Sequence, residues 1–140
     1  MPKKFKVKNI YFLIKQQTLV DNSMAEHLDT GREAEDLAAS YLIDKGYEIV
    51  ARNYRYGHAE VDLIIRKGIF LVFVEVKSRK NVKFGMPEAA VSKLKVSLVK
   101  RAADFYVYKT NWHKQIRFDV ISIVFRSDGF EIKHFEDAFY

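Results

Sequence analysis

The sequence predicts a single α/β domain in which a mixed sheet is flanked by helices, with its elements in the order αβββαββ. Three observations predict this class. The chain has 140 residues, of which 49% are hydrophobic, enough for one domain with a substantial core. Two segments repeat apolar residues at helical spacing. Five other runs are rich in Val, Ile, Phe and Tyr, as strands are.

The first helix is expected at about residues 30–45. Asp29 and Thr30 are good N-caps, acidic residues fill the next turn, and Gly46 follows the expected end. The second helix is expected from about Pro87, which suits the first helical position, to about residue 109. Its apolar residues step by three and four: Val91, Leu94, Leu98, Ala102 and Phe105.

Five strands complete the expected fold. Three lie between the helices, at about 47–54, 59–66 and 69–78. Two follow the second helix, at about 116–125 and 130–134. Gly57, Lys67-Gly68 and Asp128-Gly129 provide turns between consecutive strands.

Residues 1–28 differ from the rest of the chain. They carry half of the formal net charge of +6, and their short apolar patch at 10–14 is interrupted by Lys15. A secretory signal needs about 7–15 uninterrupted apolar residues, so we expect a disordered basic extension before a domain at 29–140. Two alternatives stay open: a basic arm that binds nucleic acid, and a true start at Met24.

Composition excludes several function classes. The chain has no cysteine, which excludes disulfides, cysteine-zinc sites and thiol catalysis. It also lacks an apolar run near the roughly 20 residues that a membrane span needs. We therefore expect a cytoplasmic protein with no membrane partner. The basic balance favours polyanions such as nucleic acid, although only weakly.

Acidic residues interrupt the second and third expected strands. Side chains alternate along a strand, so Glu60 and Asp62 share one face, as do Glu75 and Lys77. If Arg66 is the last paired residue before the turn, Glu60 lies opposite Glu75. A slip by two residues places Asp62 opposite Glu75 instead. In both registers the three carboxylates and Lys77 share one face, and because facing like charges are destabilising, this arrangement predicts a bound cation.

Each helix adds one charged residue aimed at the sheet. At about 100° per residue, Glu35 lies roughly 20° from Leu42, at the edge of the core-facing stripe. On the second helix, Lys95 lies roughly 40–60° from Val91 and Leu98, so it is the basic residue best aimed inward.

These residue types fit metal-dependent phosphodiester chemistry. Mg²⁺ prefers carboxylate oxygens and keeps several waters, so Asp62, Glu75 and Glu60 are the predicted metal ligands. Mn²⁺ is the alternative cofactor. A lysine two residues from a ligand carboxylate can orient the attacking water and offset charge that builds on the phosphate, which is the role predicted for Lys77.

Basic side chains near these acids are the predicted nucleic-acid contacts: Arg55, Arg79, Lys80, Lys83 and Lys95. Segment 52–56 interleaves basic and aromatic residues, as single-strand stacking surfaces do, but an ordinary strand end would look the same. The basic run after the third strand would contact flanking phosphates or form a solvated face. Asp119 is expected to be structural, paired with Arg117 or with a loop amide.

The order and spacing of the site residues resemble a nuclease superfamily. Asp62 is followed thirteen residues later by Glu75-Val76-Lys77 and preceded by a helix that contains Glu35, which is similar to the PD-(D/E)xK nucleases. Four longer phrases together resemble the bacterial YraN-like family. They are GREAEDLAA (31–39), AEVDLI (59–64), VFVEVKSR (72–79) and RFDV (117–120). That family is described as predicted endonucleases similar to archaeal Holliday-junction resolvases.

The resemblance covers about residues 24–140 and implies a restriction-endonuclease-like fold. It carries four residues over as the catalytic site: Glu35, Asp62, Glu75 and Lys77. Glu60 and Lys95 also match the family pattern. Ala34 replaces the usual Gly before the helix acid, and no Pro precedes Asp62, but neither departure removes a metal ligand.

These features together predict a Mg²⁺-dependent endonuclease that hydrolyses DNA phosphodiester bonds, at branched or damaged DNA. The alternative is a non-catalytic nucleic-acid-binding module on a nuclease fold. A third class is an interaction protein with a structural acidic cluster. Branch-resolving relatives act as dimers, so a homodimer is a further expectation of the resemblance.

Overall fold

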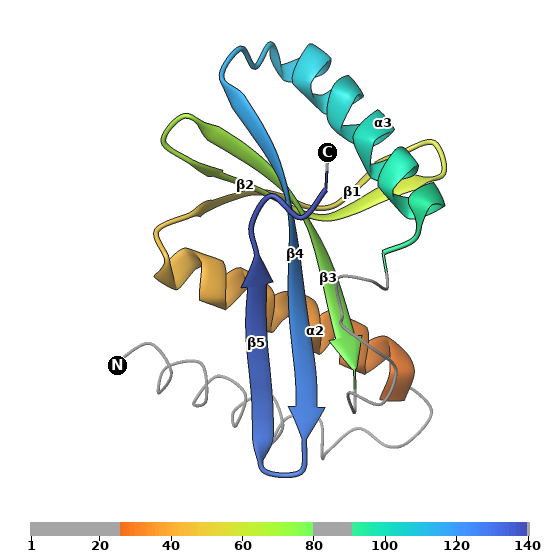
Figure 1. The fold of residues 1–140 in the computed structure, drawn as a ribbon, viewed down its shortest axis with the longest axis vertical. Coiled ribbons are helices and arrows are strands. Elements are labelled where there is room, and N and C mark those ends of the chain that lie inside the picture. Colours follow the sequence, from red (N-terminus) through yellow and green to blue (C-terminus); the bar gives the residue numbers. More distant parts are fainter. Residues whose placement is uncertain (1–25, 80–90, 140) are drawn as a thin grey trace.

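The computed structural model describes residues 26–79 and 91–139, with side chains from Thr30 onward (Figure 1). The elements follow in the predicted order αβββαββ, which confirms the fold class. They are α2 (Glu26–Asp44), β1 (Glu48–Tyr56), β2 (Ala59–Lys67), β3 (Phe70–Arg79), α3 (Lys93–Thr110), β4 (Gln115–Arg126) and β5 (Gly129–Phe135).

The five strands form one mixed sheet in the order β1-β2-β3-β4-β5. Neighbouring strands are antiparallel except for β3 and β4, which are parallel. Parallel neighbours need a long crossover connection, and the segment that contains α3 supplies it. The amino-terminal half of β3, from Phe70 to Val74, is paired with both β2 and β4 and lies in the middle of the sheet, whereas its carboxyl-terminal half is paired with β4 alone among the described strands.

The two helices cover opposite faces of the sheet. On one face, α2 packs through Leu37, Ala38 and Leu42 against a buried cluster from the strands: Leu63, Ile65, Val72, Val74, Ile121 and Ile123. On the other face, α3 packs through Val99, Ala102 and Ala103 against a second cluster: Ala59, Val61, Ile64, Leu71, Phe73 and Phe118. Neither helix has the length and apolar character needed to cross a membrane.

Both helices begin at positions other than those predicted. Helix α2 begins at Glu26, earlier than the expected start near residue 30, and continues through Gly31. Helix α3 begins at Lys93, because the Ser92 hydroxyl accepts a hydrogen bond from the Lys95 N–H at 3.1 Å and caps the helix there. The expected extension of this helix back through Val91 was wrong. Pro87, residues 1–25 and the alternative start at Met24 lie outside the described residues.

The hairpin between β2 and β3 has the slipped register. Lys67 pairs with Phe70 across a turn at Gly68 and Ile69, and Gly68 has the left-handed φ of +58° that this tight turn uses. The pairing in which Arg66 faces Ile69 was therefore wrong, and the alternative displaced by two residues is correct. Continued along the strands, this register brings Asp62 opposite Glu75.

Strict alternation along β2 also fails near the site. Val61 and Ile64 are three residues apart, which would place them on opposite faces of an ideal strand, yet both pack in the α3-side cluster. The strict alternation from which Glu60 and Asp62 were predicted to share one face therefore does not hold along the whole strand. This irregularity lies at Asp62, where β2 leaves its regular pairing with β3.

Candidate active site

The site forms where β2 and β3 separate. Their regular pairs run from Lys67↔Phe70 to Leu63↔Val74 and stop there. Past this point the Val76 N–H is donated to Asp62 Oδ2 at 2.7 Å, so a carboxylate takes the place of a strand partner. The separation thus fixes the Asp62 side chain between the two strands and opens space for polar groups inside the sheet.

Asp62 and Glu75 form a closely coupled pair of carboxylates in this space. Glu75 is buried, and Asp62 is half-buried. Burial, followed by the charge of Glu75, raises the pKa of Asp62 to about 7, although the Val76 hydrogen bond and Lys95 oppose the shift. Burial also raises the pKa of Glu75, against the opposing effect of Lys95 and Lys77. Two carboxylates with raised pKa values in one buried place indicate a site that gains from a positive charge.

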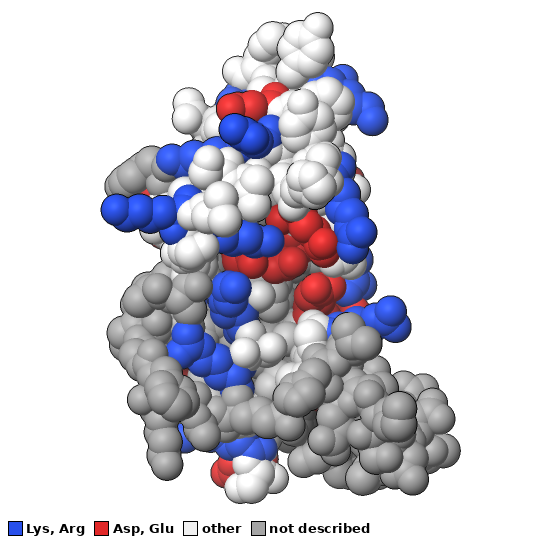
Figure 2. Space-filling view, turned by 90° about the vertical axis from the view of Figure 1, so that its right-hand side faces the viewer, with Lys and Arg blue, Asp and Glu red and all other residues white. Residues whose placement is uncertain are grey.

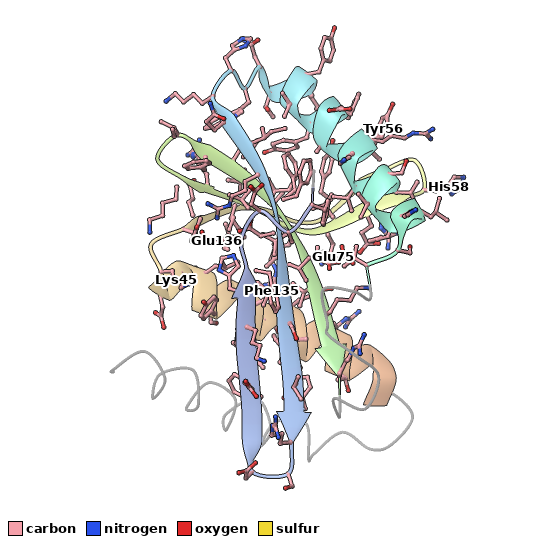
Figure 3. All side chains as sticks on the ribbon, in the orientation of Figure 1. Lys45, Tyr56, His58, Glu75, Phe135 and Glu136 are labelled. Atoms are coloured by element: carbon pink, nitrogen blue, oxygen red, sulfur yellow. The ribbon has the colours of Figure 1, made fainter. Side chains whose placement is uncertain are left out.

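Two lysines supply part of that charge. Lys77 Nζ lies 3.7 Å from Glu75 Oε1, and Lys95 Nζ lies 3.6 Å from Glu75 Oε2. Lys95 Nζ also donates a hydrogen bond to the Glu60 carbonyl oxygen at 3.1 Å, which ties the first turn of α3 to β2. Figure 3 shows Glu75 on β3 near this end of α3. The prediction that Lys95 points inward is confirmed.

Glu75 Oε2 is a buried oxygen that forms no hydrogen bond within the described part of the chain. Its separation of 3.6 Å from Lys95 Nζ exceeds hydrogen-bond distance, although the two groups form an ion pair. A buried acceptor without a donor costs free energy. The oxygen therefore has unused capacity to accept a proton, a water or a cation.

Glu35 approaches the site from α2, as the helical spacing predicted. Burial, then the Asp62 charge, raises the pKa of Glu35, while Asn53 and Arg52 lower it. With its amide nitrogen directed at the carboxylates, Asn53 donates to Glu35 Oε2 at 3.2 Å and to Glu60 Oε1 at 3.3 Å. Asn53 thus bridges the helix acid and the strand acid.

Asn53 is the site residue that sequence reasoning missed. It lies in β1 between the Arg52↔Leu63 and Tyr54↔Val61 pairs, and has a left-handed φ of 50°. Asparagine tolerates this conformation better than most residues, and it is rare in regular strands. An asparagine inside a strand-like run was therefore the available signal.

Glu60 is held at the outer edge of the site. Its Oε2 lies 3.3 Å from Arg55 Nε, across the β1–β2 pair, and Asn53 takes its other oxygen. Within residues 26–79 and 91–139, no group of three or more His, Asp or Glu side chains is arranged to hold a metal ion. The geometry thus leaves Asp62 and Glu75 as the direct ligand candidates, with Glu60 further out.

This donor set fits a hard divalent cation. Mg²⁺ is commonly bound through one or two protein carboxylates, with waters and substrate phosphates completing its coordination. Asp62 and Glu75 provide two carboxylates, and Glu75 provides the buried oxygen without a hydrogen bond. The residues present therefore fit Mg²⁺ or Mn²⁺ through two carboxylates rather than three.

The predicted nucleic-acid contacts divide into three groups. Arg55 is exposed and Lys95 is half-buried, and both contact the acidic site through Glu60 or Glu75. Arg79 is half-buried and ends β3. Lys80 and Lys83 lie outside the described residues. Figure 2 shows Asp and Glu side chains gathered in the middle of this side of the molecule, with Lys and Arg side chains around them.

Asp119 lies on the opposite face of the sheet and has a structural environment. It is fully buried and forms two hydrogen bonds with Arg117, both at 2.8 Å. It also accepts from His134 Nε2 at 2.7 Å and from the Asp137 N–H at 3.0 Å. Burial alone would raise the pKa of Asp119, but these hydrogen bonds hold it below its usual value. Both predicted partners, Arg117 and a loop amide, are present.

Comparison with known proteins identifies the family. Residues 34–123 match the model of the uncharacterised protein family UPF0102. The UPF0102 protein of Phocaeicola vulgatus is 44% identical over 117 residues, which are 84% of this chain and 97% of the relative. Those of Flavobacterium psychrophilum and Bacteroides thetaiotaomicron are 43% and 42% identical, with the same 84% of this chain and 98% and 97% of each relative. The chain belongs to the UPF0102 family.

Proposed function

We propose that this protein is a divalent-cation-dependent endonuclease that hydrolyses phosphodiester bonds of DNA. One observation carries the proposal: Asp62 and Glu75 form a pair of carboxylates inside the sheet, and a lysine lies near each oxygen of Glu75. In a purely structural site, both acids would form short ion pairs, and every carboxylate oxygen would accept a hydrogen bond. Here the lysine nitrogens stay 3.6–3.7 Å from Glu75, and one Glu75 oxygen has no hydrogen bond within the described chain.

Asp62 and Glu75 are the residues that would hold the cation. When bound, Mg²⁺ or Mn²⁺ supplies Lewis-acid polarisation of a phosphate and lowers the pKa of a coordinated water. The Val76 N–H fixes the orientation of Asp62, so its remaining oxygen is directed by the backbone rather than by a flexible contact.

The two lysines have different roles. Lys77 is half-buried on the same strand face as Glu75, from which its ammonium can orient a water and stabilise charge on a phosphate oxygen. Lys95 holds the Glu60 carbonyl and offsets the charge of Glu75, which keeps the first turn of α3 against the site. Glu35, with a raised pKa, is a proton-accepting group at the edge of the site.

A cleavage panel tests the proposal. Duplex, single-stranded, flap and four-way-junction DNA would be incubated with the full chain in Mg²⁺, Mn²⁺ or EDTA. We expect cleavage of at least one substrate in Mg²⁺ or Mn²⁺, none in EDTA, and none by Asp62→Asn. Absence of cleavage from every substrate in both metals would contradict the enzymatic assignment, as would cleavage in EDTA.

One observation favours a second candidate, a non-catalytic nucleic-acid-binding module. Lys77 and Lys95 already compensate Glu75 without a cation, and Glu60 is engaged by Arg55 and Asn53. Such a module would bind DNA equally well in EDTA and Mg²⁺. Because the module would not cleave DNA in either metal, the cleavage panel separates the two candidates.

A further inference from the structure

A hollow on the exposed side of α3 lies apart from the carboxylates. It has a volume of about 520 Å³ and is lined by Tyr56, Arg101, Asp104, Phe105 and Tyr108. Four of these residues come from α3 and one from the end of β1. Figure 3 shows Tyr56 and His58 at the hairpin beside α3, at a distance from Glu75. No lining residue belongs to the acidic site.

The aromatic rings of this hollow are arranged for stacking. Tyr56 and Phe105 are stacked, with ring centroids 4.3 Å apart and an interplanar angle of 15°. Tyr108, the third ring, is 85% exposed, so it contributes little to the core. Tyr54 differs, since it packs edge-on against Tyr106 in the α3-side cluster. Of the two aromatic residues in segment 52–56, only Tyr56 is thus exposed.

The polar groups of the hollow are of the kinds that form hydrogen bonds with a nucleobase edge. Arg101 provides planar donors and Asp104 provides an acceptor, and both side chains are exposed on one turn of α3. Neither forms an ion pair with a residue that the structure describes. Bases are read by such side chains, arginine as donor and aspartate as acceptor. A phosphate alone would be repelled by Asp104.

The charge and course of α3 connect the hollow to the site. The helix carries five basic residues and one acidic residue, with no acid in its first turn, so it attracts a polyanion. Lys95 contacts Glu75, and at 1.5 Å per residue the hollow lies roughly 9–20 Å further along the helix. That span corresponds to about three to six stacked nucleotides at ~3.4 Å per step.

From these observations we propose that the hollow at Tyr56, Phe105 and Tyr108 binds an unpaired nucleobase, in a single-stranded segment of the nucleic acid that α3 leads to the carboxylates. This inference rests on the proposed function and specifies its substrate class: nucleic acid with a single-stranded portion beside the cleavage position. Base–aromatic stacking tolerates any base, so the hollow would recognise strandedness more than sequence.

The proposal is tested by measuring the binding of nucleic acid in EDTA, where metal-dependent cleavage cannot occur. Fluorescence anisotropy of a short labelled DNA single strand, and of the RNA strand of the same sequence, is measured with the full chain in EDTA. Tyr108→Ala should weaken single-strand binding about 5- to 100-fold, the scale of one lost stack. Tyr108→Phe should bind like wild type, because it keeps the ring. Blunt duplex binding should change less than twofold.

Leu94→Ala is the matched control. Leu94 is 71% exposed on the same helix but lies outside the hollow, so its truncation should leave single-strand binding unchanged. Phe105→Leu provides a second variant that breaks the stacked pair while keeping an apolar side chain. If these variants bind the DNA and the RNA strand more weakly to the same extent, the hollow recognises the base. If they bind only one of the two strands more weakly, the hollow is specific for that type of nucleic acid.

Three results would overturn the proposal. Wild-type protein could fail to bind the single strand, or Tyr108→Ala and Phe105→Leu could bind as tightly as wild type. Light scattering could instead show a wild-type dimer that Tyr108→Ala dissociates, which would make the hollow an interface between copies of the chain. None of these results bears on metal-dependent cleavage, which the panel on Asp62→Asn measures separately.

Discussion

Lys95 Nζ lies 3.6 Å from Glu75 Oε2 and donates a hydrogen bond to the Glu60 carbonyl at 3.1 Å. One side chain therefore joins α3 to both acid-bearing strands. Its ammonium also offsets the charge of the carboxylate pair in the absence of a metal. This contact makes the stability of the metal-free protein depend on the same groups that the proposed chemistry uses.

Removal of Lys95 should destabilise the metal-free protein. In Lys95→Ala the two carboxylates lose a compensating charge, and we expect a loss of about 1–3 kcal/mol, less than for a fully buried pair because Lys95 is partly exposed. Mg²⁺ should restore part of this loss by replacing the charge. Melting curves with and without Mg²⁺ measure the effect. The neighbouring exposed Lys93→Ala is the control, and equal melting of both variants would contradict the role of Lys95.

Stability should fall as pH rises across the titration of Asp62. Burial and Glu75 raise the pKa of Asp62 from 3.8 to about 7, so between about pH 4 and pH 7 the folded state binds more protons than the unfolded state. This contribution is fully present below the unfolded pKa and is lost as pH rises through the folded pKa. From about pH 5.5 to about pH 8 the metal-free wild type should lose on the order of 2 kcal/mol relative to Asp62→Asn. Urea unfolding of both proteins at the two pH values measures this difference, and parallel changes would refute it.

Substitutions of Lys77 and Glu75 should separate the loss of cleavage from the loss of metal binding. Lys77→Ala should keep most of its metal affinity but lose cleavage by about 10²–10³-fold, the scale of one preorganised electrostatic contact. Glu75→Ala should lose both. DNA affinity of Lys77→Ala should fall only modestly, since one lysine is one phosphate contact among several. Melting curves must show that Lys77→Ala is folded, and a folded variant that cuts as fast as wild type would refute the catalytic role.

Asp119 should contribute to the free energy of unfolding and not to cleavage. Asp119→Asn leaves Arg117, whose side chain is only 14% exposed, without a charged partner inside the sheet. We expect a loss of about 3 kcal/mol in urea unfolding. Glu131→Gln removes an exposed ion pair with Arg126 and should cost less than about 1 kcal/mol. Cleavage per folded molecule should match wild type in both variants, and a specific loss in Asp119→Asn would place it in the active site.

Sequence periodicity predicted most of the fold because the core is regular. Leu42 and Ala102 lie in apolar repeats at helical spacing and are buried, although Leu94 and Phe105 of the second repeat are exposed, and the buried strands are rich in Val and Ile. Helix starts were less predictable because they depend on single contacts. Helix α3 begins after Ser92 rather than at Pro87, because the Ser92 hydroxyl accepts one hydrogen bond from the Lys95 N–H. The apolar repeat, which begins at Val91, does not contain this information.

The site was predictable in its residues but less so in its geometry. Face and helical-angle arguments brought Glu35, Asp62, Glu75 and Lys95 to one place. The hairpin register depended on whether the turn used Lys67-Gly68 or Gly68-Ile69, which residue types do not decide. The bridge made by Asn53 depends on a left-handed residue inside β1, and alternation rules assume that none exists.

Calorimetric titration of Mn²⁺ into wild type and Asp62→Asn at about pH 8 tests the central claim most directly, because it needs no knowledge of the DNA substrate. At this pH the Asp62 carboxylate, whose pKa is raised to about 7, is ionised and available to a cation. We expect wild type to bind Mn²⁺ and Asp62→Asn to bind it more than about tenfold more weakly, since even an outer contact to a metal site contributes that much. Glu131→Gln, which removes one exposed carboxylate on β5, should bind like wild type. Equal Mn²⁺ binding by wild type and Asp62→Asn would contradict a cation site at Asp62 and Glu75.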